Sequence, residues 1–339
     1  MKQKYQNIFF LIGVVAIVIM LFSFDISYRD LWHNLQRAGW WFFAVVLIWV
    51  PQYLLNAMSW GVILREGTRK NPMPFLKLLK YTISGYSLNY VTPIGLLGGE
   101  PYRIMVLTPY VGGTRATSSV ILYAMMHIFS HFVFWAFSIL LYIVLYVKEI
   151  HVLMAVFLIL VASFCSLGIY FFMKGYRNGL AMKTLHFIGH IPGLKRWSRK
   201  FIETRRDKIE EIDSQISELH AQSRKTFYLS LFLEFSSRVV GCMEIWFIFM
   251  ILTDTPSFWN CILIQAFTSL FANIFFFMPM ELGAREGGFA LAVGGLSMSG
   301  AFGVFAGLLT RVRELIWIVI GIGLMKIGEN KTKQCVKDE

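Results

Sequence analysis

Pro93-Ile-Gly-Leu-Leu-Gly-Gly-Glu100 interrupts an apolar part of the sequence, and Pro279-Met-Glu-Leu-Gly-Ala-Arg-Glu286 repeats its outline far along the chain. Each stretch begins with proline and ends, after six intervening residues, with glutamate. Proline and glycine break helices, and an ionisable side chain at membrane depth is unfavourable. Two such breaks at corresponding points of two halves predict a transporter-like core around a site near the bilayer midplane.

The composition around these breaks is that of a membrane protein. Hydrophobic residues make up 56% of the 339 residues and charged residues only 15%, a balance that soluble domains do not have. The chain has room for about six to eight helical spans of roughly 20 residues each. We therefore expect an all-α, polytopic membrane protein without a separate soluble catalytic domain.

The sequence disfavours several other kinds of site. The formal charge of +12 gathers in loops, where lysine and arginine set topology and contact anionic lipids, so we expect no nucleic acid partner. No Walker, dinucleotide-binding or nucleophile-elbow motif stands at a strand-to-helix junction, and we expect no cofactor. His127 and His131 have a spacing that can hold zinc but lack a clear third ligand. The cysteines lie singly, which predicts neither a metal site nor a disulfide framework, at Cys165, Cys242, Cys261 and Cys335.

Six apolar runs are long enough to cross a bilayer as helices. Segments 75–107 and 258–298 are also apolar but interrupted, and each predicts a broken, re-entrant pair of half-helices. Residues 258–278 alone are long enough to span fully, so that alternative stays open. The interrupting residues include Pro93, Gly98 and Gly99 in the first segment and Pro279 and Gly283 in the second. The six runs cover about Ile8 to Phe24, Trp41 to Leu64, Thr117 to Val147, Val152 to Met173, Phe227 to Leu252 and Ser299 to Met325.

Loop charges predict the orientation, because positive residues prefer the cytoplasmic side. The basic loop after the second apolar run and the basic C-terminal tail place both termini in the cytoplasm. The two broken segments then enter from opposite faces, as in an inverted repeat. We expect a first membrane half at 1–173, a basic cytoplasmic linker with an amphipathic helix at 174–225, and a second membrane half at 226–339. The linker helix either only joins the halves or also lies on the membrane or packs on a partner.

Each break supplies one carboxylate and one guanidinium. Glu100 and Arg103 are three residues apart, which places both on one face of a helix, and Arg285 directly precedes Glu286. Helix N-termini that follow the breaks would add exposed N–H groups and positive dipole ends, a combination that suits a phosphate. The alternative is that the charges only neutralise each other and satisfy loosened backbone.

Further charges lie inside the predicted spans. Glu234 and Arg238 have the i, i+4 spacing of an ion pair in the fifth apolar run. Arg311, Arg313 and Glu314 interrupt the last run near its middle and join the site candidates. Intramembrane ionisable residues are candidates for function by default, although a purely structural pair is the alternative for Glu234 and Arg238.

The run Thr92-Pro-Ile-Gly-Leu-Leu-Gly-Gly-Glu-Pro-Tyr-Arg103, followed by Pro279-Met-Glu-Leu-Gly-Ala-Arg-Glu-Gly287, resembles the flippase-like membrane family named for the transmembrane region of lysylphosphatidylglycerol synthase. The order of a Gly-Glu-x-x-Arg element, a Pro-x-x-x-Gly-x-x-Glu element and an arginine in the last helix is similar. Glu281 departs from the pattern, since such motifs carry a small residue there. The resemblance implies a site formed by Gly99, Glu100, Arg103, Pro279, Gly283, Arg285 and Glu286, with either Arg311 or Arg313 as the last-helix arginine.

The resemblance also implies a function. The family is named for bifunctional proteins whose soluble domain attaches lysine to phosphatidylglycerol and whose membrane domain moves the product across the bilayer. For this chain it implies binding and translocation of a lipid headgroup, either of aminoacylated phosphatidylglycerol or of a polyprenyl-phosphate-linked lipid. We expect no aminoacyl transfer, because we expect no soluble synthase domain.

We therefore expect a transporter of anionic or polyprenyl-phosphate lipids in a bacterial or archaeal plasma membrane. Two alternatives stay open. One is a membrane-embedded transferase that acts on a lipid phosphate, with Glu100 or Glu286 as general base. The other is a non-catalytic membrane protein whose basic linker docks a partner.

Overall fold

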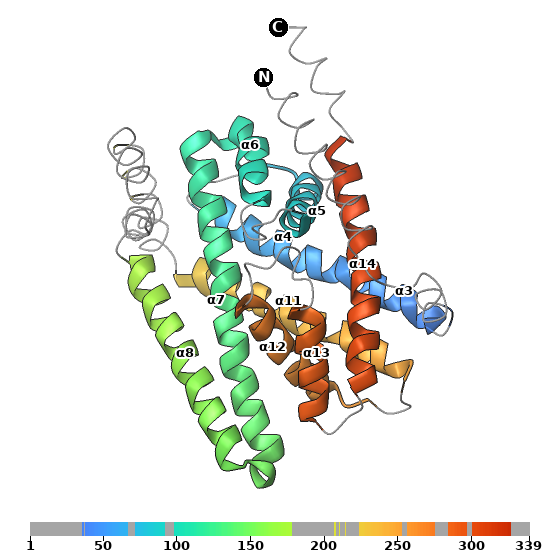
Figure 1. Cartoon of the computed structure of the whole chain (residues 1–339). Coiled ribbons are helices and arrows are strands. Elements are labelled where there is room, and N and C mark those ends of the chain that lie inside the picture. Colours follow the sequence, from blue (N-terminus) through green and yellow to red (C-terminus); the bar gives the residue numbers. More distant parts are fainter. Residues whose placement is uncertain are drawn as a thin grey trace, which may run out of the picture. The chain divides into compact units, whose positions relative to one another are not determined.

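The computed structural model describes residues 38–66, 72–91, 98–177, 224–252, 256–274, 284–296 and 300–326, together with residues 36, 207, 210 and 214. Within these ranges all regular secondary structure is helical, which confirms the expected all-α class for this part of the chain (Figure 1). Three kinds of predicted feature lie outside the described residues. They are the first span, most of the linker, and the break residues Pro93, Pro279 and Gly283.

Among the described residues, three stretches are long and apolar enough to cross a membrane. They correspond to the second, third and fourth apolar runs of the sequence. The first joins α3 (Trp40–Leu47) to α4 (Trp49–Arg65), the second joins α7 (Gly113–Tyr146) to the 3-10 turn η1 (Val147–Glu149), and the third is the apolar part of α8 (Val152–Arg177).

Two further helices cover the fifth and sixth predicted runs. They are α11 (Arg224–Met250) and α14 (Gly300–Lys326), each 27 residues long. A helix of that length rises about 40 Å, enough to cross the hydrocarbon core. Both carry glutamate and arginine in their interiors, which sets them apart from the apolar α8.

Helices flank both predicted breaks. α5 (Phe75–Val91) precedes the first break and α6 (Gly99–Val111) follows it, while α12 (Phe258–Ile274) precedes the second and α13 (Ala284–Gly295) follows it. Pro101 lies in the first turn of α6, where its missing N–H leaves no helical bond unmade. The re-entrant arrangement and the inverted repeat stay predictions.

The chain packs as two compact units. Unit 1 comprises Met1–Tyr53, Phe75–Arg103 and Val240–Glu339, and unit 2 comprises Leu54–Pro74 and Ile104–Val239. Each unit draws on both predicted membrane halves. The predicted division at 1–173, 174–225 and 226–339 concerns membrane topology, and it stays a prediction.

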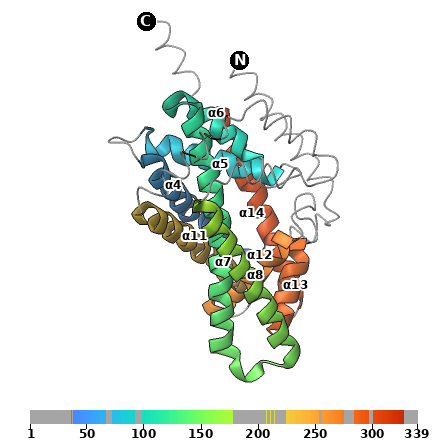
Figure 2. The same ribbon diagram turned by 90° about the vertical axis from the view of Figure 1, so that its left-hand side faces the viewer.

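Unit 1 is organised around α14, which lies beside α5 and α13 (Figures 1 and 2). Small residues let α5 and α14 approach closely: Ser84 Oγ donates to the Gly321 carbonyl oxygen at 2.8 Å and Ser87 Oγ to the Trp317 carbonyl oxygen at 3.1 Å. The two hydroxyls therefore cross-link the helices through their main chains. An apolar core joins α3, α11, α12, α13 and α14, and it includes Val45, Ile248, Phe249, Ile264, Val293 and Leu309.

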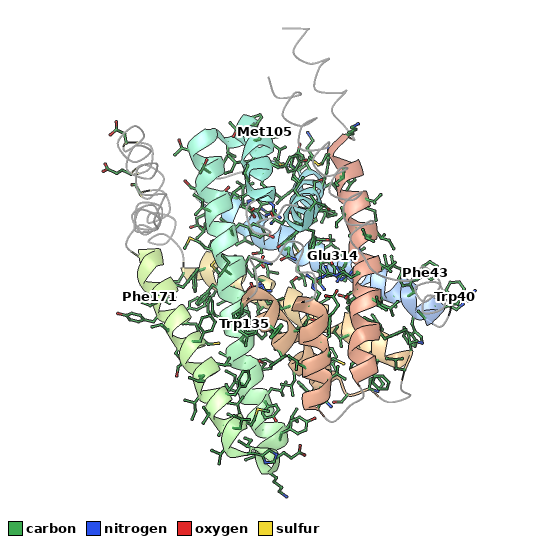
Figure 3. All side chains as sticks on the ribbon, in the orientation of Figure 1. Trp40, Phe43, Met105, Trp135, Phe171 and Glu314 are labelled. Carbon is green, nitrogen blue, oxygen red and sulfur yellow. The ribbon has the colours of Figure 1, made fainter. Side chains whose placement is uncertain are left out.

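Unit 2 contains the hairpin of α7 and α8, which run side by side (Figures 1 and 2). Phe129 stacks on Phe172 across the hairpin, with 4.1 Å between ring centres. Most of α8 is exposed, including Phe171, which points away from the ribbon in Figure 3. An exposed apolar surface on a helix of this length is what contact with lipid chains requires.

Candidate functional site

The first break places a glutamate in the first turn of α6. Glu100 pairs with Arg103 one turn later, with 2.9 Å between Glu100 Oε1 and Arg103 Nη1. Asn89 of α5 donates to the same carboxylate oxygen at 3.2 Å, and its own amide oxygen accepts from Gly99 N–H at 2.6 Å. Asn89 therefore caps α6 and holds Glu100 in place. No local spacing in the sequence predicts this contact, because Asn89 and Glu100 are 11 residues apart on two different helices.

Arg103 occupies space that a glycine leaves on α5. Its side chain is almost fully buried, and its guanidinium lies 4.7 Å from the centre of the Tyr86 ring. Arg103 Nη2 also donates to the Thr82 carbonyl oxygen at 3.4 Å. A Cβ on Gly85 would overlap Arg103 Nε, so the fit depends on glycine. The ion pair, the ring and the carbonyl together hold the guanidinium in one orientation.

The second break also places charged residues in the first turn of a helix. Arg285 and Glu286 are the second and third residues of α13, and both reach α14. Glu286 Oε1 accepts from Arg311 Nε at 2.8 Å, and Arg285 Nη1 donates to Glu314 Oε2 at 2.8 Å. Arg311 Nη1 lies 3.3 Å from the same Glu314 oxygen. Figure 3 labels Glu314 near the middle of α14, where side-chain nitrogen and oxygen atoms gather. Of the two last-helix arginines, Arg311 is thus the one that contacts the second break.

Arg313 has a different partner. Its Nε lies 2.7 Å from Glu244 Oε1 and its Nη2 lies 3.1 Å from Glu244 Oε2, so the pair is bidentate. The guanidinium also lies 3.9 Å from the centre of the Trp49 ring, and Trp49 Nε1 donates to Glu244 Oε2 at 2.9 Å. The sequence marks Glu244 only as a further charge along the fifth apolar run, and its partner Arg313 is 69 residues away. The sequence feature that points to Glu244 is a single glutamate near the end of an otherwise apolar stretch of α11.

Aromatic rings connect the ion pair at the first break to the Arg313–Glu244 pair. Tyr86, beside Arg103, has its ring centre 5.8 Å from that of Tyr53. Tyr53 in turn lies 5.5 Å from Trp49, beside Arg313. The two arginines therefore stand at the ends of one run of rings from α4 and α5, each with a cation–π contact.

Unit 1 thus holds a charge-balanced set of side chains, which we call the Glu–Arg cluster. The ion pairs above arrange four glutamates and four arginines in three groups: a pair at the first break, a set of four between α13 and α14, and a pair between α11 and α14. Five members are almost fully buried, whereas Glu100, Arg285 and Glu286 have side-chain exposures of 16%, 15% and 28%. These three lie in the first turns of α6 and α13 and form the accessible part of the cluster. Its members are Glu100, Arg103, Glu244, Arg285, Glu286, Arg311, Arg313 and Glu314.

Glu234 and Arg238 lie in unit 2 and contact α7 rather than each other. Glu234 Oε2 is 2.8 Å from His127 Nδ1. Arg238 donates to Ser130 Oγ at 2.7 Å and to His131 Nε2 at 2.9 Å. The expected i, i+4 pair is therefore wrong. Each of the two side chains instead bonds residues of the neighbouring helix α7.

The predicted hinge residues are only partly described. Gly98 is buried, and a Cβ on Gly99 would overlap the carbonyl oxygen of Gly85, so only glycine fits where α6 begins. Pro93, Pro279 and Gly283 lie outside the described residues. Across the part of the chain that is described, no group of three or more His, Cys, Asp or Glu side chains is placed to hold a metal ion.

Comparison with known proteins identifies the family. The model of the family described as the lysylphosphatidylglycerol synthase TM region matches residues 9–323, which include both breaks. No curated protein and no solved structure matches the chain. The match confirms the resemblance seen in the two motifs and makes the chain an integral membrane protein with helical spans and an association with membrane lipids. The chain belongs to the family of the lysylphosphatidylglycerol synthase transmembrane region.

Proposed function

We propose that this protein is a flippase-like transporter, which binds the headgroup of a membrane lipid at the Glu–Arg cluster and moves it across the bilayer. The placement of Glu100 and Glu286 carries the proposal. Each lies in the first turn of a helix after a break, each is bound by an arginine, and each is partly exposed. Membership of a family linked to lipid modification or transport supports it.

The energetics favour a binding role for the cluster. A single ionised residue at the centre of a membrane helix is unfavourable by about 2.5–3.5 kcal/mol. Pairing reduces that penalty, yet a buried ion pair is often no more stable than a well-packed apolar replacement. Stability alone therefore gives little reason for eight ionisable side chains in one unit, whereas recognition of a charged ligand does.

The pairing pattern favours particular headgroups. The arginines at both breaks already hold carboxylates, so a phosphate binds them best by displacing Glu100 or Glu286. The displaced carboxylate then needs a cation. A headgroup that carries both a phosphate and an ammonium group, as in aminoacylated phosphatidylglycerol, satisfies both partners at once. A polyprenyl-phosphate-linked lipid satisfies the arginine alone.

The proposal includes a path for the headgroup. Two inverted halves that alternate around the cluster would expose it to each side of a bacterial or archaeal plasma membrane in turn, with both termini in the cytoplasm. The acyl chains would stay in the bilayer throughout. A membrane-embedded transferase is the alternative, with Glu100 or Glu286 as base. The observed pairs favour transport, because both carboxylates are already engaged by arginine.

Lipid retention tests the proposal. Wild-type protein and the Glu100→Gln/Glu286→Gln double variant are purified in lipid nanodiscs, and their bound lipids are compared by native mass spectrometry and lipidomics. We expect one lipid class to be enriched on the wild type and reduced roughly tenfold or more in the variant, since a charged hydrogen bond is worth about 1.5–3 kcal/mol. Glutamine keeps the side-chain size and removes the charge.

Glu149→Gln is the matched control, because Glu149 is an exposed glutamate in η1. It should leave the lipid profile unchanged. Identical profiles for the wild type and the double variant would contradict a headgroup site at the breaks. The enriched lipid is then placed in vesicles with the protein. Movement of intact lipid between leaflets supports transport, and chemical conversion of the lipid supports the transferase.

A further inference from the structure

A second polar site lies in unit 2, between α7 and α11. Glu234 is fully buried, and Glu234 Oε2 lies 2.8 Å from His127 Nδ1. Its other oxygen, Oε1, has no hydrogen-bond partner among the described residues. A buried carboxylate with one unsatisfied oxygen is unfavourable unless a positive charge stands beside it. His127 is the group in contact with Glu234 that can supply that charge.

The hydrogen bonds distinguish the two histidines of α7. Arginine only donates, so His131 Nε2 accepts from Arg238 and the His131 ring is neutral. An ionised glutamate only accepts, so His127 Nδ1 donates to Glu234. A further proton on His127 goes to Nε2 and makes an imidazolium in direct contact with the carboxylate. Protonation of His131 at Nε2 would instead break its bond to Arg238.

Among the described residues, the groups in contact with His127 include charged and titratable side chains of α7 and α11. α7 contributes Tyr123 and His131, and α11 contributes Glu234 and Arg238. Arg238 opposes a positive charge on His127, but it bonds the main-chain oxygen of that residue, whereas Glu234 bonds the ring itself. Coulomb energy falls with distance, so the carboxylate has the larger effect. The rings that α4 and α8 bring to this part of α7 are uncharged, and they include Trp60 and Phe172.

His127 lies deep in a candidate span. It follows Gly113 by 14 residues and precedes Glu149 by 22, which corresponds to about 21 and 33 Å of helix. One quarter of the His127 side chain is exposed, against 1% of Glu234. The histidine is therefore the accessible member of the pair and the glutamate the enclosed one. Asp, Glu and His side chains at this depth form the proton relays of pumps and transporters.

We infer that His127 and Glu234 form a membrane-embedded proton-binding site, in which His127 takes one proton from water at Nε2 and Glu234 supplies the countercharge. At Nε2 one N–H bond forms, while one O–H bond of a hydronium ion in the solvent breaks and leaves water. The site shares no residue with the Glu–Arg cluster, and its occupancy does not depend on the proposed lipid transport. A proton bound at this depth is a ligand whose gradient can drive a membrane transporter.

Nuclear magnetic resonance of labelled histidine tests this inference directly. The full chain is prepared in lipid nanodiscs with nitrogen-15 histidine, and the His127 signals are identified among the seven histidines with a His127→Gln variant. We expect protons on both ring nitrogens of wild-type His127 at about pH 6, within the range where imidazole charge changes. At the same pH, Glu234→Gln should lower the doubly protonated fraction of His127 at least roughly threefold, because the amide keeps a hydrogen bond but lacks the charge.

The Arg238→Gln variant tests the opposite electrostatic effect, because it removes a cation that disfavours protonation of His127. It should leave the doubly protonated fraction of His127 equal to or above that of the wild type. The signal of the exposed His151 serves as a reference in every sample. A His127 ring with a single proton in the wild type down to about pH 5 would overturn the inference. An unchanged fraction in Glu234→Gln would overturn it as well. Should the Glu234→Gln variant fail to fold, the wild-type and Arg238→Gln samples still show whether His127 binds a second proton.

Discussion

At the scale of single residues, charge is compensated pair by pair across helices. Arg313 and Glu244 are both buried, with side-chain exposures of 4% and 5%, and they are paired through two hydrogen bonds. Trp49 adds a ring face to the cation and an N–H to the carboxylate. Removing one member would leave the other as an uncompensated buried charge.

Glu244→Gln should therefore destabilise the protein by about 3–5 kcal/mol, the usual effect of breaking a buried pair. The Glu244→Gln/Arg313→Gln double variant should recover part of the loss, because it leaves no unpaired charge. Thermal unfolding of the purified protein, followed by tryptophan fluorescence, measures both. Glu149→Gln is again the surface control and should leave the Tm unchanged. Equal Tm values for Glu244→Gln and the wild type would show that the pair does not stabilise unit 1.

At the scale of elements, the contact of α5 with α14 depends on small residues. A Cβ on Gly321 would overlap Ser87 Oγ and approach the Ile83 carbonyl oxygen to 3.1 Å. Gly323, two residues further along α14, has open space where its Cβ would lie. Because α5 also carries Asn89 and Tyr86, the spacing of the two helices controls where Glu100 and Arg103 lie.

Gly321→Ala should destabilise the protein by about 1–3 kcal/mol, the usual effect of overpacking a tight contact. It should also weaken lipid retention, since α5 would move with Arg103. Gly323→Ala is the matched control on the same helix and should be neutral or slightly stabilising, because alanine is the better helix former. Tm and nanodisc lipid content are measured for both. Equal values in the two variants would mean that this contact does not set the helix spacing.

At the scale of the whole molecule, each compact unit is assembled from segments far apart in the sequence. Unit 1 combines α3, α5, α12, α13 and α14 with parts of α4, α6 and α11. Residues on both sides of each predicted break thus share one packing unit. Membrane topology is a separate property. The predicted inverted repeat requires the two broken segments to enter the membrane from opposite faces.

Cysteine accessibility measures that topology. In a background without the native cysteines, Tyr110→Cys and Thr253→Cys should react with a membrane-impermeant reagent from opposite sides of the membrane. Tyr110 is predicted to face the cytoplasm and Thr253 the other side, because the loop charges orient the intervening spans. Reaction of both cysteines from the same side would exclude the inverted arrangement. A cysteine at exposed Lys148, tested from both sides, reports whether the vesicles are sealed.

The sequence alone predicts the helical class, three candidate spans, the helices on each side of both breaks and the family. It also predicts the Glu100–Arg103 pair, because residues three apart on one helix share a face whatever surrounds them. Helix packing selects which charges meet across helices. It pairs Arg313 with Glu244, holds Glu100 through Asn89, and turns Glu234 to His127 instead of Arg238. The reason is physical: the apolar pattern of a helix shows that it is buried, whereas the rotation and spacing of packed helices select each partner, and these follow from the side chains of every neighbour at once.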